Sequence, residues 1–132
     1  MAPARRSRSP KEALVHEMLE RVADKWTLLV IDVLEGGRPV RFSRLRDALG
    51  HVSQKMLTKT LRQLERDGLV VRRVHPEIPP RVDYQLTALG VSLGESVCGL
   101  WTWVEANLQS VHRSREVYDA AAARRRGLGR TA

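Results

Sequence analysis

The sequence has only one cysteine, Cys98, among its 132 residues. A single thiol can neither close an internal disulfide nor supply the several thiolates of a zinc cluster, and this usage is typical of a reducing compartment. No apolar run approaches the roughly 20 residues that span a bilayer, and the N-terminus lacks the apolar stretch of a secretory signal. We therefore expect a cytoplasmic chain with no membrane segment.

Catalytic groups are equally sparse. The four histidines are dispersed and have no cysteine at metal-ligand spacing, and no glycine-rich phosphate loop is present. Acidic residues number 15 against 23 lysines and arginines, which leaves a formal charge of +8. Because a cationic surface concentrates polyanions around it, the charge favours a polyanionic partner, of which nucleic acid is one. We expect no enzyme activity, no metal and no cofactor.

The length and the hydrophobic content of 42% suit one globular core with additions at its ends. Residues 1–10 combine three arginines with Ala, Ser and Pro, which predicts a flexible basic arm. Residues 11–110 carry the apolar periodicity of a folded domain. Residues 111–132 contain a run of four alanines and then three arginines, which predicts a basic tail, either a short helix or disordered.

Two helices are expected before residue 38. Between residues 11 and 22, apolar side chains recur at three- and four-residue steps, as on a helix with one buried stripe. Asp24 can cap a second helix that keeps this rhythm until Gly36 and Gly37 stop it. Residues 38–42 are too few for a helix and include Pro39, so they favour a brief extended segment.

A helix-turn-helix is expected next. Ser43 can cap a short helix that carries Leu45 on its apolar side. Gly50–Val52 can turn the chain into a second helix, over residues 54–66, that Ser53 caps. The exposed N–H groups at the start of this second helix can meet a phosphate.

The helix at 54–66 has two contrasting faces. The stripe toward the core consists of Leu57, Leu61 and Leu64, with Met56 and Thr60 beside it. The opposite face gathers Gln54, Lys55, Thr58, Lys59 and Arg62. Arg and Lys can donate to guanine, Gln can read adenine, and Thr can contact a phosphate or a thymine methyl. An ordinary amphipathic helix with a solvated lysine face would show the same pattern. The neighbouring segment is therefore needed to decide whether this face binds DNA.

That neighbouring segment predicts two short antiparallel strands, at residues 69–74 and 81–86. In the second strand, apolar residues alternate with polar ones such as Asp83, which should point outward from a half-buried sheet. In the first strand, the periodicity does not decide whether Arg72 or Arg73 points outward.

Between the strands stand three prolines, which cannot donate ladder hydrogen bonds. The tip should therefore protrude as a stiff loop with His75 and Arg81 at its base, where they can face a DNA backbone or minor groove. The expected fold is mainly α with a small antiparallel β-hairpin (α+β), which is a winged helix-turn-helix.

A long helix should follow the hairpin, with Thr87 as its cap. Its apolar side chains keep the helical period over about five turns, from residue 88 to residue 108. A helix this long and this apolar does not suit a free surface, so we expect it to be buried against a partner.

Five segments between residues 12 and 108 carry a family resemblance: Lys25–Leu29, Arg41–Leu45, Ser53–Thr58, Leu64–Val70 and Pro76–Thr87. Together they resemble the HxlR family of bacterial transcriptional regulators. The resemblance implies a homodimer held by the first and last long helices, which presents two recognition helices to successive major grooves. It also implies regulation of transcription, often repression of a nearby gene.

Two sets of site residues follow from the periodicity and the resemblance together. Predicted DNA contacts are Ser43, Arg44, Ser53, Gln54, Lys55, Thr58, Lys59, Arg62, His75 and Arg81. Predicted dimer contacts are Leu14, Met18, Leu93, Val97, Leu100, Trp101, Val104 and Leu108.

One position departs from the family. Members that sense oxidants place a cysteine thirteen residues before the tryptophan that corresponds to Trp26, and this sequence has Ala13 there. Alanine has no thiol to oxidise, so that switch is not expected. Cys98 on the last helix could substitute as a sensor, but a buried, inert cysteine is the favoured interpretation.

The sequence therefore predicts a homodimeric regulator, a repressor acting at an inverted-repeat operator on the nucleoid. A low-specificity nucleoid-associated DNA-binding protein is the main alternative. A protein-interaction module that uses the apolar helix at 88–108 is a weaker one. A small-molecule effector stays open, because no residue identifies its ligand.

Overall fold

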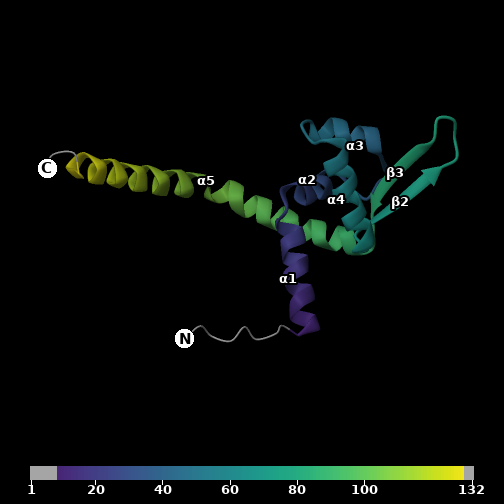
Figure 1. Cartoon of the computed structure of the whole chain (residues 1–132), viewed down its shortest axis with the longest axis horizontal. Helices are drawn as coiled ribbons and strands as arrows, with labels where there is room; N and C mark the ends of the chain where they lie inside the picture. Colours follow the sequence, from purple (N-terminus) through teal and green to yellow (C-terminus); the bar gives the residue numbers. More distant parts are fainter. Residues whose placement is uncertain (1–8, 130–132) are drawn as a thin grey trace. The chain divides into compact units, whose positions relative to one another are not determined.

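The computed structural model describes residues 9–129 (Figure 1). Its elements, in chain order, are α1 (Pro10–Ala23), α2 (Lys25–Val33), β1 (Val40–Arg41), α3 (Phe42–Leu49), α4 (Gln54–Arg66), β2 (Val70–His75), β3 (Arg81–Leu86) and α5 (Ala88–Gly129). Residues 1–8 of the predicted basic arm lie outside the described part. Contacts divide the chain into a unit up to residue 95 and a unit from residue 96, so α5 contributes to both.

Side-chain caps define the first two helices. The Ser9 hydroxyl accepts a hydrogen bond from the backbone N–H of Glu12, and Pro10 occupies the first helical position, where its missing N–H costs nothing. Asp24 ends α1 and caps α2, since its carboxylate accepts from the N–H groups of Trp26 and Thr27 at 2.8 and 3.2 Å. The predicted cap at Asp24 is confirmed.

The helix-turn-helix is formed by α3, a short turn and α4. Gly50 ends α3 with φ +67°, a left-handed conformation that glycine adopts without strain. Ser53 caps α4 as predicted, with its Oγ accepting from Met56 N–H at 3.1 Å. The predicted cap at Ser43 is wrong: α3 begins at Phe42, directly after the strand residue Arg41, and its start has no side-chain cap.

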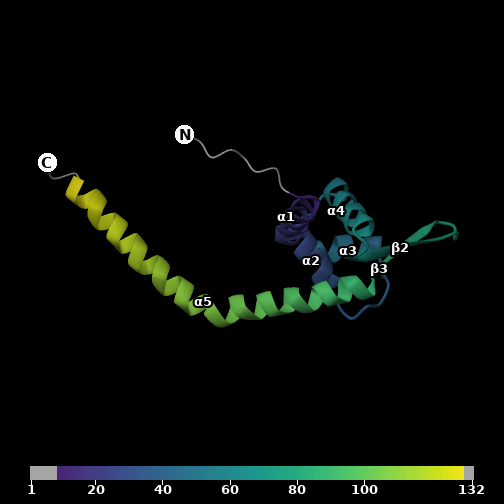
Figure 2. The ribbon, with the colours of Figure 1, turned by 90° about the horizontal axis from the view of Figure 1, so that it is seen from below.

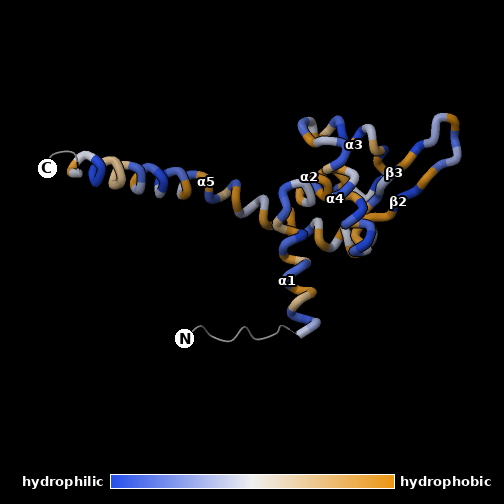
Figure 3. Tube along the Cα trace, in the orientation of Figure 1, coloured by the Kyte–Doolittle hydropathy of each residue, from blue (hydrophilic) through white to orange (hydrophobic). Residues whose placement is uncertain are grey.

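The core of the first unit forms where α4 meets α2 and the sheet, and apolar residues gather there (Figure 3). Leu57, Leu61 and Leu64 of α4 are fully buried, as their spacing predicted. Thr60 is buried too, with its hydroxyl donating to the Met56 carbonyl at 3.0 Å. Met56, predicted beside the core stripe, is instead 40% exposed, because it lies in the first turn at the edge of the packed face.

The three strands form one antiparallel sheet in the order β1-β3-β2. β2 and β3 continue as a hairpin that extends away from α2, α3 and α4 (Figure 2). Arg72 pairs with Tyr84 and Arg73 with Asp83, so the two arginines lie on opposite faces and both are exposed. The predicted outward position of Asp83 is wrong, because this carboxylate is buried among cationic neighbours.

The start of α5 is held by the turn between α4 and β2. Thr87, the predicted cap, donates from its hydroxyl to the Gly68 carbonyl at 2.6 Å and accepts from Gly90 N–H at 3.1 Å. Its backbone N–H also donates to the Leu69 carbonyl at 3.0 Å. Gly90 comes so close to this turn that a Cβ there would overlap the Leu69 carbonyl oxygen.

The second unit consists of the rest of α5, which runs without interruption to Gly129. The sequence predicted a tail from residue 111 that was either a short helix or disordered, but α5 continues to Gly129 with no helix boundary. The physical reason is visible in the sequence: from Leu100 to Arg126 there is no Gly or Pro, and the run Ala120–Ala123 favours helix strongly. Within residues 9–129, no helix is long and apolar enough to cross a membrane.

The close contact at Gly90 makes a stability prediction. Gly90→Ala should lower the free energy of unfolding by about 1–3 kcal/mol, because the added methyl group meets rigid backbone. Gly94→Ala is the matched control, since its Cβ would lie 3.6 Å from Ile31 Cγ2, an ordinary contact. The control should gain about 0.5–1 kcal/mol from helix propensity. Urea unfolding of both variants checks the opposite signs, and equal effects would contradict the packing described.

Candidate nucleic-acid interface

The outward face of α4 carries the polar set that the helical period predicted. Gln54, Lys55, Lys59 and Arg62 are exposed and Thr58 is half-buried, while the leucines on the other side are in the core. Ser53 is exposed at the start of the helix, where the free N–H groups point outward. This face offers three cations, an amide and a hydroxyl on one side of one helix.

A groove of about 540 Å³ lies beside this face, between the starts of α3 and α4 and the hairpin. Its lining consists of Arg41, Phe42, Ser43, Gln54, Thr58, Arg72, Glu77, Ile78, Pro79, Pro80, Arg81, Val82 and Tyr84. One concave surface is therefore surrounded by three guanidinium groups, the amide of Gln54 and the hydroxyls of Ser43 and Thr58. This combination suits the phosphate and sugar edges of a nucleic acid.

Two contacts join α4 and α3 to the sheet at this groove. Arg72 Nε of β2 lies 3.5 Å from Glu65 Oε2 of α4. The rings of Phe42 and Tyr84 lie 6.4 Å apart between their centroids, at a tilt of 49°. Burial raises the pKa of the Tyr84 hydroxyl, and Arg72 beside it opposes this rise. The tyrosine is therefore a neutral, buried support for the groove.

The base of the hairpin is organised by the buried carboxylate of Asp83. His75 Nε2 lies 2.9 Å from Asp83 Oδ2, and Arg81 Nε lies 3.6 Å from Asp83 Oδ1. Arg81 also lies 3.6 Å from Glu77, which is closer to the tip. His75 and Arg81 are at the hairpin base as predicted, but both are only partly exposed because they contact Asp83.

The predicted DNA contacts do not all converge. Ser43, Gln54, Thr58 and Arg81 line the groove, whereas the remaining predicted contacts do not. Those outside the lining are Arg44, Ser53, Lys55, Lys59, Arg62 and His75.

Sequence reasoning missed two of the groove's cations. Arg41 and Arg72 were not among the predicted contacts, although both line the groove. Arg72 follows from strand register once its pairing with Tyr84 is known. Arg41 depends on the pairing of β1 with β3, for which two residues give too short a pattern.

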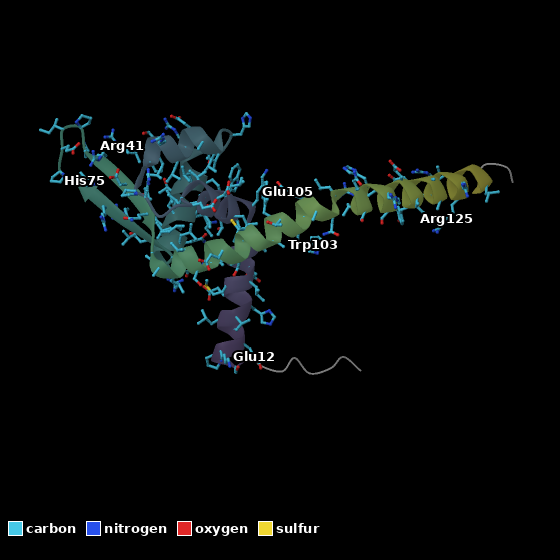
Figure 4. All side chains as sticks on the ribbon, turned by 180° about the vertical axis from the view of Figure 1, so that it is seen from behind. Glu12, Arg41, His75, Trp103, Glu105 and Arg125 are labelled. Atoms are coloured by element: carbon cyan, nitrogen blue, oxygen red, sulfur yellow. The ribbon has the colours of Figure 1, made fainter. Side chains whose placement is uncertain are left out.

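The predicted dimer residues split into two groups. Met18 and Leu93 are partly buried against the core of their own chain. Leu14, Leu100, Trp101, Val104 and Leu108 are exposed, and Val97 is half-buried. The side chain of Trp103 projects from α5 in Figure 4, as does that of Glu105, whose carboxylate accepts from Trp101 Nε1 at 2.6 Å. Cys98, predicted to be buried, is exposed on the single chain.

Metal-binding clusters were not expected from the sequence. Among residues 9–129, no group of three or more His, Cys, Asp or Glu side chains is placed to hold a metal ion. Polar side chains converge at the groove and at the hairpin base.

Comparison with known proteins identifies relatives of this architecture. A model of the HxlR-like helix-turn-helix family matches residues 21–112. The HTH-type transcriptional regulator YtfH of Escherichia coli (strain K12) is 42% identical over 100 residues, which cover 76% of this chain and 79% of the relative.

Two solved structures share the fold. The transcriptional regulator ytfH from Salmonella typhimurium is 41% identical with a TM-score of 0.71, over 77% of this chain and 90% of that one. The redox regulator HypR in its reduced form is 33% identical with a TM-score of 0.69, over 76% of this chain and 98% of that one.

The buried Asp83 carboxylate makes the second prediction. Asp83→Ala should lower the free energy of unfolding by about 1.5–3 kcal/mol, because it removes charge-assisted contacts from His75 and Arg81 inside the sheet. Glu77→Gln is the matched control, since it removes an ion pair whose carboxylate is 56% exposed. The control should cost less than about 1 kcal/mol. Denaturant unfolding measures both, and an Asp83→Ala variant as stable as the control would contradict the anchoring role.

Proposed function

Because the chain belongs to the HxlR-like helix-turn-helix family of transcriptional regulators, we propose that it is a sequence-specific repressor that binds an inverted-repeat operator as a homodimer. The helix-turn-helix is its DNA-binding domain. In this proposal α4 enters the major groove, and the β2–β3 hairpin is the wing that reaches the flanking minor groove.

The outward face of α4 is the observation that carries this proposal. Its leucines are buried, so the helix cannot rotate, and Gln54, Lys55 and Arg62 stay exposed on the other side. Side chains of these kinds have the donors that read guanine and adenine edges in a major groove. The groove cations Arg41 and Arg72 then lie where phosphates pass between α4 and the wing.

The apolar surface of α5 supports a homodimer. Leu100, Trp101 and Val104 are each at least 44% exposed on the single chain. Apolar surface of this kind, repeated along one helix, is typical of a protein interface. A second copy of the same chain offers a matching helix, and two-fold pairing is the commonest form of self-association.

Symmetry in the protein predicts symmetry in the DNA. Half-sites should be about 10 base pairs apart, or a multiple of this spacing, so that both copies of α4 meet the same side of the duplex. If the dimer neutralises about eight phosphates, the logarithm of its affinity should fall with the logarithm of the salt concentration with a slope near −7. Repression would follow if the operator overlaps a promoter. Binding of this kind would keep the protein in the cytoplasm, on the nucleoid.

A low-specificity nucleoid-associated role would use the same cationic surface. The two roles differ in the affinity for one DNA sequence relative to others. A specific regulator should bind its selected site roughly a thousandfold more tightly than random duplex. Competition with excess random DNA measures this ratio directly. A ratio near one would favour the nucleoid-associated role.

The third prediction tests α4. Lys55→Ala and Arg62→Ala should each weaken binding to a duplex selected from a random library by about tenfold or more, because each removes a donor to DNA. Lys11→Ala is the control, since it removes one exposed cation from α1 and should change affinity little. Fluorescence anisotropy titration measures all three. If both α4 variants bound selected and random DNA as the parent does, α4 would not be the reading helix.

The fourth prediction tests the dimer. Leu100→Glu and Val104→Glu should yield monomers, because a buried unpaired carboxylate opposes helix pairing strongly. Gln109→Glu is the matched control, because residue 109 lies on the other side of the same helix from residues 100 and 104. Sedimentation equilibrium distinguishes the species. Dimeric Leu100→Glu would place the interface elsewhere, and a monomeric parent would favour the protein-interaction module.

A further inference from the structure

Ile78 stands at the tip of the β2–β3 hairpin with its side chain in solvent. Its relative exposure is 102%, the highest among the large hydrophobic side chains of the described residues. Full exposure forfeits the free energy that burial of a branched aliphatic side chain supplies. The packing of the single chain therefore gives this residue no role.

The tip that carries Ile78 is held in place. Pro76, Pro79 and Pro80 fix their own φ angles, which leaves the loop few alternative conformations. Glu77 lies 3.6 Å from Arg81 across the loop, and His75 contacts Asp83 at the base. With its loop restricted in this way, the side chain of Ile78 can contact another molecule without a change in the loop conformation.

The tip also faces the side where α4 offers its polar groups. Ile78 lines the same groove as Gln54 and Thr58, so it borders the surface on which the duplex would lie. Between His75 and Arg81 the loop has no cation, and its one acid, Glu77, is next to Arg81. Such a tip is unsuited to a phosphate, and its chemistry matches the apolar walls and base faces inside a groove.

We propose that Ile78 is an apolar wedge that enters the minor groove beside each half-site, partly opens a base step and bends the duplex. This inference rests on the proposed function, since it requires α4 in the adjacent major groove. Branched aliphatic and proline side chains inserted between base steps kink DNA by about 20–90° in other minor-groove complexes. Pyrimidine–purine steps are the easiest to open, so the wedge would add sequence preference where no hydrogen bond reads a base.

The test uses the duplex that the full-length protein binds most tightly from a random library. Each duplex has about 40 base pairs, which is enough for two half-sites and their flanks. One set of duplexes carries a fluorescence donor and acceptor at its ends to report bending. A second set carries 2-aminopurine at successive positions beside each half-site, where unstacking raises its fluorescence. The affinity is measured over a range of salt concentrations.

The parent should shorten the end-to-end distance and brighten 2-aminopurine at one step on each side. Ile78→Ala should lose most of both signals and bind about tenfold more weakly. Its salt slope should stay that of the parent, because no phosphate contact is removed. Ile78→Leu, which keeps an aliphatic side chain of the same size, should retain both signals. Val71→Thr is the matched control and should keep both signals, since Val71 is exposed on the face of the sheet opposite to the groove residues Arg72 and Tyr84.

Two outcomes would overturn the wedge. If Ile78→Ala bends and unstacks the duplex as the parent does, the tip does not insert, and a tip reserved for a protein partner would give this result. If the parent binds but leaves the duplex straight and stacked, no wedge exists. In both cases loss of binding in Lys55→Ala would still support the proposed function, whereas a parent that does not bind duplex DNA would refute both.

Discussion

Burial of one leucine stripe on α4 is the constraint on which the rest of the structure depends. Leu57, Leu61 and Leu64 have essentially no exposure, and each would cost about 2–5 kcal/mol if truncated to alanine. Because successive residues are about 100° apart around a helix, fixing these three side chains fixes the direction of every other one. A rotation by one residue would bring Arg62 or Thr58 into the core and withdraw its polar group from the surface. The face that we propose for DNA binding is therefore a consequence of the core.

The hairpin is tied to this fixed helix by contacts of a different kind. Arg72 lies close to Glu65 of α4, and Tyr84 is buried beside Phe42 of α3, so the sheet contacts both helices. Asp83 adds a buried anion that holds Arg81 and His75 at the base of the wing. Under the proposed function, α4 and the hairpin would meet two grooves of one duplex in a preorganised arrangement, which lowers the entropy lost on binding.

Local patterns predicted the parts of this arrangement that local forces determine. Caps at Asp24, Ser53 and Thr87 are hydrogen bonds within three residues, and the leucine stripe is a simple period, so both were visible in the sequence. The burial of Asp83 was not, because its partners come from other strand positions and only the register brings them together. The start of α3 was also mispredicted, because the chain passes from β1 directly into the helix at Phe42 and Ser43 lies inside the first turn.

The residue at position 13 and the packing of α4 limit how such a regulator could respond to a signal. Ala13 of α1 carries no thiol, so oxidation cannot act at that point of this chain. The core fixes α4 within each subunit, and a signal that rotated it would have to break the leucine packing. Under the proposed function, the spacing between the two copies of α4 is the quantity that can change at low energetic cost. That spacing is set by the dimer helices, so an effector that alters their pairing would change the fit to both half-sites while each core stays intact.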